Sequence, residues 1–179
     1  DLALAVRMHE VVLAHQLELL HVHYALPHAT SAWIAREMLR ETGSDVGVIT
    51  TLHGTDITIV GQDRSFHAII KFSIEKSDRI TAVSHFLRDE TFFAFGCTGC
   101  NVEVIHNFVD PDIYDRAKYP PVLRDQVGGK PILMHVSNFR AVKRVRDVVR
   151  IFARVRRVMP AALVMVGDGP DRVDAEEEA

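Results

Sequence analysis

The chain has 179 residues, of which 47% are hydrophobic and 25% charged, an ordinary composition for a globular protein. Its formal net charge of −3 argues against a protein that binds nucleic acid over its whole surface. No apolar run approaches the ~20 residues that cross a bilayer, and no targeting signal follows Asp1, so we expect a cytoplasmic protein without stable membrane insertion. Because the first residue is not Met and the acidic tail Asp174–Ala179 lacks a closing element, we expect an internal fragment.

The two cysteines are too few for a disulfide framework. Cys97-Thr98-Gly99-Cys100 has the spacing of a redox or metal motif. It lies in a predicted loop rather than at the start of a helix after a strand, so a redox role is disfavoured.

Residues up to about 110 alternate short apolar runs with segments whose apolar residues recur every three or four positions. The helical segments are Leu2–Leu13, Ala29–Arg40, Ser65–Lys76 (with Phe66, Ile69, Ile70 and Ile74 inward) and Phe86–Phe95, with Gly43 and Gly96 as stops. The predicted strands are Leu19–Tyr24, Val46–Leu52, Arg79–Val83 and Val102–Ile105. This alternation predicts a parallel α/β sheet, in which ligands bind at the carboxyl ends of the strands.

Polar side chains occupy those strand ends. His23, His53, Ser84 and Asn107 all fall at or just beyond the end of a predicted strand. Alternation places His21 on the same face as His23, a spacing that would suit two metal ligands, but no Cys or carboxylate stands at the usual ligand spacing. We therefore expect no metal, and expect these histidines to form hydrogen bonds with a substrate or a neighbouring loop.

His53-Gly54-Thr55-Asp56 is the most informative motif of the first half. Gly54 lets the backbone turn sharply and approach a ligand closely, while His53 and Thr55 offer hydrogen bonds. An equally good interpretation is a loop in which Asp56 caps a short helix.

The chain changes character at Asp110. From there to Lys130 it is rich in Pro and Gly without a clear period, which predicts a linker and the start of a second domain. The second domain is predicted to contain strand Ile132–Val136, helix Val142–Val158 and strand Ala162–Val166, followed by Gly167-Asp168-Gly169-Pro170. Two strands are few for a parallel sheet, so this domain looks truncated.

The turn Ser137–Arg144 joins the first of these strands to the helix. Arg140 and Lys143 are predicted to sit at the helix start, where free backbone N–H groups favour an anion such as a diphosphate. The alternative is a solvated basic helix end, because Arg144, Arg146, Arg150 and Arg154 continue the charge. A nucleic-acid contact through Arg146, Arg150, Arg154 and Arg157 is a further alternative, but helical spacing makes these a mostly solvated face. The Gly-x-Gly-x-x-Gly, Walker and Gly-x-Ser-x-Gly patterns are all absent.

Taken in order, the motifs resemble those of family 4 retaining glycosyltransferases of the GT-B fold, over nearly the whole chain up to about Pro170. They are His21–His28, His53-Gly54-Thr55-Asp56, Thr81–Ser84, Asn107–Pro111, Val136–Arg140 with Lys143-Arg144, and Val166–Pro170. The resemblance implies two Rossmann-like parallel-sheet domains that face each other across a cleft, both incomplete here. Residues 1–110 would be the carboxyl-terminal part of the acceptor-binding domain, 111–129 the hinge or linker, and 130–179 the start of the nucleotide-sugar domain.

The same resemblance implies the chemistry. The subfamily it points to transfers N-acetylglucosamine from UDP-N-acetylglucosamine to the hydroxyl of L-malate with retention of configuration, the first step of bacillithiol synthesis, without a metal or other cofactor. The implied catalytic residues are His53, Arg140 and Lys143. Donor binding falls to Asn138, Arg140, Lys143, Gly167 and Gly169, with Asn138 standing where the family usually has an Arg. Acceptor binding falls to His53, with Tyr24, Thr55 and Ser84 assigned from their positions at strand ends.

Two other functions stay open. One is a family 4 transferase with another acceptor, such as an inositol phosphate or a lipid-linked sugar. The other is a non-catalytic nucleotide-sugar binding module. The sequence leaves open whether the protein forms a homo-oligomer, and we expect the fragment alone to be inactive.

Overall fold

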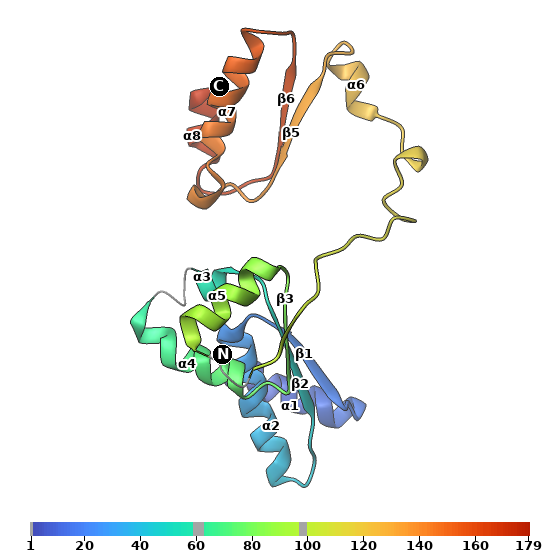
Figure 1. Cartoon of the computed structure of the whole chain (residues 1–179). Helices are drawn as coiled ribbons and strands as arrows, with labels where there is room; N and C mark the ends of the chain where they lie inside the picture. Colours follow the sequence, from blue (N-terminus) through green and yellow to red (C-terminus); the bar gives the residue numbers. More distant parts are fainter. Residues whose placement is uncertain (1, 59–62, 97–99) are drawn as a thin grey trace. The chain divides into compact units, whose positions relative to one another are not determined.

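The computed structural model describes residues 2–58, 63–96 and 100–179 (Figure 1). The chain divides into two compact units, Asp1–Val109 and Asp110–Ala179. The division falls next to the predicted hinge at 111–129. The acceptor and donor roles assigned to the two sides stay predictions.

The first unit is built on a four-stranded parallel sheet with strand order β1-β2-β3-β4. The strands are β1 (Leu19–His23), β2 (Gly47–Leu52), β3 (Arg79–Ala82) and β4 (Val102–Val104). The helical elements are α1 (Leu2–His15), the π-turn η1 (Ala25–Ala29), α2 (Thr30–Glu41), α3 (Thr55–Thr58), α4 (Arg64–Glu75) and α5 (His85–Phe95). The predicted parallel α/β class is confirmed.

One face of this sheet carries the apolar core. Strand side chains such as Val22, Val48, Leu52 and Ala82 are buried there, together with side chains from α1, α2, α3, α4 and α5. Successive strand residues alternate between faces, so the intervening positions point to the opposite face. The register aligns His23 with Thr51 and Thr51 with Thr81, which places polar groups in one row across that second face.

The ends of the helices follow local sequence signals. Gly96 has a left-handed φ of 56° and ends α5, as predicted. Asp63 begins α4 by accepting a hydrogen bond from the Ser65 backbone N–H at 2.9 Å. The prediction that Phe66 points inward is wrong, because this residue in the first turn of α4 is 42% exposed.

A buried arginine ties α2 to the sheet. The Arg36 side chain is only 6% exposed and donates hydrogen bonds to Asp78 Oδ2 at 2.9 Å and to the Lys76 carbonyl at 2.7 Å. The same Asp78 oxygen accepts the Val48 backbone N–H at 2.7 Å. The contact therefore joins α2, β2 and the turn before β3.

The second unit contains the parallel pair β5 (Ile132–Val136) and β6 (Ala162–Val166), at the predicted bounds. Phe139, Val145, Val149 and Ala175 form its buried core, with Leu163 and Met165 packed against them. The other elements are η3 (Arg116–Lys118), α6 (Val122–Gln126), η4 (Ala141–Lys143), α7 (Val145–Arg156) and α8 (Arg172–Glu178). The segment predicted as a plain linker therefore contains η3 and α6.

The structure of this unit differs from the predictions in two places. Helix α7 begins at Val145 instead of Val142, because Arg144 takes a left-handed φ of 50° and separates α7 from the short 3-10 turn η4. The acidic tail, for which no element was predicted, forms α8, which packs on α7, and Glu178 accepts a hydrogen bond from Arg150 at 2.9 Å. In the part of the chain that the structure describes, no helix has the length and hydropathy to cross a membrane.

Candidate active site

Two histidines meet at the carboxyl ends of neighbouring strands. His23 is the last residue of β1, and His53 follows β2 directly. His23 Nδ1 lies 2.7 Å from His53 Nε2, a hydrogen-bond distance, and the ring centroids are 4.9 Å apart. The Tyr24 ring lies 5.2 Å from the His53 ring, because a φ of 76° turns Tyr24 out of β1. The structure therefore brings together three residues that stand at predicted strand ends.

Polar groups on the same sheet face support this pair. His21 Nε2 lies 2.8 Å from Thr51 Oγ1, which lies 2.7 Å from Thr81 Oγ1. Both threonines are buried, so their hydroxyls satisfy each other where water is scarce. The His21 ring is 4.8 Å from the His23 ring and packs beside it. This row holds the two histidine rings over β1 and β2.

The surroundings of His23 disfavour a positive charge. Its pKa is lowered from the ordinary value of 6.5, first by burial and then by repulsion from His21, His53 and His28. His23 is therefore neutral at neutral pH, with one ring nitrogen that donates and one that accepts.

A cavity of about 550 Å³ opens on this face of the sheet. Its lining includes His21, His23, His53 and His106, with the charged side chains of Arg79 and Glu103. Asn107, which follows the last predicted strand of this unit, lines it too. Imidazole, amide and guanidinium groups in one cavity can bind hydroxyl and carboxylate groups.

The other residues predicted from strand ends have different surroundings. Ser84 Oγ accepts the Leu87 backbone N–H at 3.1 Å and caps α5, a role that a Ser before a helix could have indicated. Thr55 is exposed at the start of α3. The predicted short helix forms as α3, which begins one residue before Asp56. Neither Ser84 nor Thr55 lines the cavity.

In the second unit, the loops after β5 and β6 contact each other through their backbones. Phe139 N–H donates to the Asp168 carbonyl at 2.9 Å, and Ser137 N–H donates to the Val166 carbonyl at 3.1 Å. A Cβ at Gly167 would lie 1.8 Å from the Ser137 carbonyl oxygen, and one at Gly169 would lie 2.3 Å from that of Phe139. Only glycine permits this approach. The predicted donor loops, including Asn138, therefore lie side by side.

Arg140 and Lys143 belong to the first of these loops and are both exposed. They lie before the start of α7, because Arg140 precedes η4, Lys143 is the last residue of η4, and Arg144 separates η4 from α7. Arg144 is paired with Asp147 at 2.6 Å, whereas neither Arg140 nor Lys143 has an ion-pair partner among the residues that the structure describes. The side-chain charges of both residues can therefore bind an external anion.

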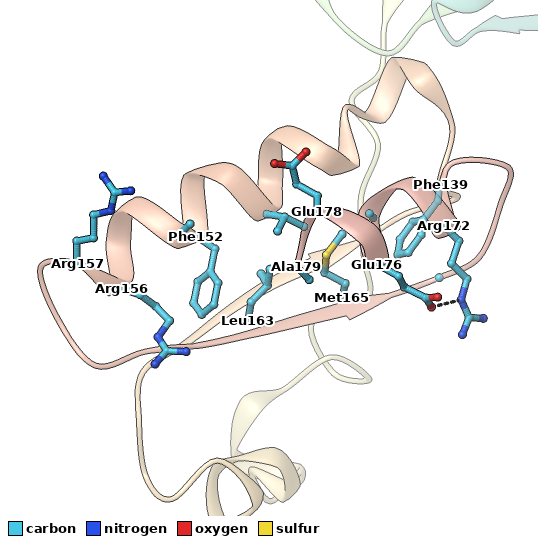
Figure 2. A pocket seen from close by; sticks show the side chains of 14 residues that line it. Phe139, Phe152, Arg156, Arg157, Leu163, Met165, Arg172, Glu176, Glu178 and Ala179 are labelled. Atoms are coloured by element: carbon cyan, nitrogen blue, oxygen red, sulfur yellow. Dashed lines mark hydrogen bonds and ion pairs between the residues drawn. The ribbon is translucent and has the colours of Figure 1, made fainter.

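A cavity of about 770 Å³ lies between α7, α8 and β6, close to these loops (Figure 2). Phe139, Phe152, Leu163 and Met165 give it an apolar wall, with arginine and glutamate side chains at the rim. Neither Arg140 nor Lys143 lines it, so it does not form the predicted phosphate site.

The described residues contain no group of three His, Cys, Asp or Glu side chains that could hold a metal ion. Independence of metals stays a prediction. The motif Cys97–Cys100 falls largely outside the described residues, which exclude 97–99.

A parallel α/β unit with polar groups at its strand ends agrees with the family comparison. The model of Glycosyltransferase Family 4 matches residues 1–113, and the chain belongs to this family. The chain is 44% identical over 174 residues to the N-acetyl-alpha-D-glucosaminyl L-malate synthase of Bacillus anthracis. That alignment covers 96% of this chain and 44% of the relative, so the chain spans less than half of the relative's length.

Proposed function

We propose that this chain is part of a retaining glycosyltransferase that moves N-acetylglucosamine from UDP-N-acetylglucosamine to the hydroxyl of L-malate, the first step of bacillithiol synthesis. The observation that carries the proposal is the 44% identity to a synthase whose name specifies an N-acetylglucosaminyl malate product. In this reaction the malate hydroxyl oxygen forms a bond to the anomeric carbon. The bond from that carbon to the diphosphate breaks, UDP leaves, and the hydroxyl proton is released.

The first unit would bind the acceptor. Its cavity carries histidines and Arg79, which suit a dicarboxylate with one hydroxyl group. His53 would contact the transferred sugar and the acceptor, with Tyr24 packed against its ring. Thr55 and Ser84 stay weaker candidates for acceptor contacts, since the Ser84 hydroxyl already caps α5.

The second unit would bind the donor. Negative charge grows on the diphosphate as the glycosidic bond breaks, and fixed positive charge lowers the energy of that transition state. Arg140 and Lys143 supply two exposed cations without ion-pair partners in the described segments, so they would hold the diphosphate without a metal. Asn138, Gly167 and Gly169 shape the loops beside them.

The full-length protein incubated with UDP-N-acetylglucosamine and L-malate tests the proposal. We expect UDP release and an N-acetylglucosaminyl malate detected by mass spectrometry, with the α configuration in its NMR coupling constant and unchanged yield in EDTA. If the sugar were transferred to an inositol phosphate or a lipid-linked sugar and not to malate, the proposed acceptor would be wrong. Binding of the donor without transfer to any acceptor would contradict an enzyme.

A further inference from the structure

A direct hydrogen bond joins two imidazole rings in the candidate site. His23 Nδ1 and His53 Nε2 lie 2.7 Å apart, at the carboxyl ends of the adjacent parallel strands β1 and β2. We propose that His23 is a positioning residue that fixes the ring orientation and tautomer of His53, leaving His53 Nδ1 as the nitrogen for substrate. This proposal rests on the proposed function, in which His53 contacts the reacting groups.

His23 is itself held firmly enough to position another ring. Its carbonyl oxygen accepts a hydrogen bond from His28 Nδ1, at the end of the turn η1. Its ring packs 4.8 Å from His21, which is bonded to Thr51 of β2. The Tyr24 backbone N–H donates to the Thr51 carbonyl at 2.9 Å and continues the β1–β2 ladder past the strand end. Because His23 is held by β1, β2 and η1, its hydrogen bond to His53 ties the orientation of the His53 ring to the sheet.

A ring-to-ring hydrogen bond also limits the charge of the pair. One nitrogen must donate and the other must accept. If both rings were protonated on both nitrogens, two N–H groups would face each other across this contact. The groups that face the pair are His21 on β1, His28 on η1 and Tyr24, with Arg79 and Glu103 in the same cavity. Most of these are basic, so a charge on His23 is disfavoured. The pair then carries at most one extra proton.

With His23 neutral, the tautomer of His53 depends on which ring donates. If His23 donates from Nδ1, His53 accepts at Nε2 and carries its own proton on Nδ1. If a neutral His53 donates from Nε2, its Nδ1 can accept a hydrogen bond from the hydroxyl of the acceptor substrate. Each arrangement gives His53 a different tautomer, so the bond ties the tautomer of His53 to that of His23, in place of the independent mixture of an isolated ring. Loss of His23 would remove this restriction.

Substitutions at His23 in the full-length protein distinguish the effect of its hydrogen bond to His53 from the effect of its side-chain volume. The side-chain amide of Asn places its polar atoms two bonds from Cβ, as Nδ1 does, whereas Gln places them one bond further, near the position of Nε2. We expect His23→Ala to lower kcat for transfer by up to about 100-fold, with a smaller change in the KM for donor. His23→Asn restores most of that loss and His23→Gln does not. His15→Asn, at the exposed end of α1, is the matched control.

A second measurement does not depend on the substrates. The ¹⁵N chemical shifts of the imidazole rings report the tautomer of His53 in each variant. We expect the wild type and His23→Asn to show one dominant His53 tautomer, and His23→Ala to show a mixture. Wild-type tautomer and kcat in a folded His23→Ala protein, or equal rescue by Gln and Asn, would overturn the positioning role. If the wild type fails to glycosylate malate, the proposed function fails, while the NMR comparison still decides the inference about His53.

Discussion

Replacement of Gly167 by Ala tests whether the two donor loops need their close backbone contact. The residue has a φ of +142°, a region that side-chain-bearing residues rarely enter, at a cost of about 1–3 kcal/mol. The new Cβ would lie 1.8 Å from the Ser137 carbonyl oxygen, far inside the 3.4 Å at which ordinary contact begins. Relief by backbone movement adds about 1–3 kcal/mol. It also weakens the Phe139 to Asp168 hydrogen bond, worth about 1 kcal/mol.

We therefore expect Gly167→Ala to lower the free energy of unfolding by about 3–7 kcal/mol, a large part of the 5–15 kcal/mol of a typical domain. Gly128→Ala is the matched control in the same unit. Its φ of +63° makes Ala unfavourable by about 1–2 kcal/mol, but nothing lies within 4 Å of the added Cβ. Urea unfolding and UDP affinity by calorimetry, both in the full-length protein, measure the difference. The reasoning would be refuted if Gly167→Ala lowered the free energy of unfolding no more than Gly128→Ala does and bound UDP with wild-type affinity.

Three further predictions follow from other contacts. Arg140→Ala or Lys143→Ala should lower turnover by ~10²-fold or more while Arg154→Ala on α7 should not, and equal rates in a transfer assay would remove the diphosphate role. Arg36→Ala should lower the free energy of unfolding by about 2–4 kcal/mol in urea titrations, because it leaves the Lys76 carbonyl unpaired, and a loss under 1 kcal/mol would show that the pairing is dispensable. His23 has a lowered native pKa, so its stabilising effect is full above pH 6.5 and is lost as pH falls below it; His23→Asn should flatten this part of the acid dependence of the urea midpoint, and an unchanged slope would assign it elsewhere.

The strands were the most predictable part of the fold. Ile132–Val136 and Ala162–Val166 match β5 and β6 at both ends. Pro131 precedes the first run, the polar pair Ser137-Asn138 follows it, and Pro160 and Gly167 flank the second. The start of α7 was not predictable, since Arg144 adopts a left-handed conformation that its residue type rarely takes. Helix α8 was missed because Ala175 is its only buried residue, too little for an apolar period.

The candidate site was predictable in position but not in detail. His23 and His53 follow from the rule that ligands bind at strand carboxyl ends. Their direct bond depends on the β1–β2 register, which couples residues thirty positions apart and leaves no local pattern. Ser84 shows the reverse case, because its position before a helix could have indicated the capping role. The roles assigned to Arg140 and Lys143 stay predictions.

The hydrogen bonds between the loops after β5 and β6 join peptide groups, and this has an evolutionary consequence. Since Phe139 and Asp168 are linked through backbone atoms, their contact does not depend on which side chains flank them. The side chain of Asn138 can therefore be exchanged without loss of this backbone contact. Single substitutions can therefore change the exposed side chains of these loops while their backbone contact is kept. Gly167 and Gly169 are the exceptions, because an added Cβ would overlap the facing backbone.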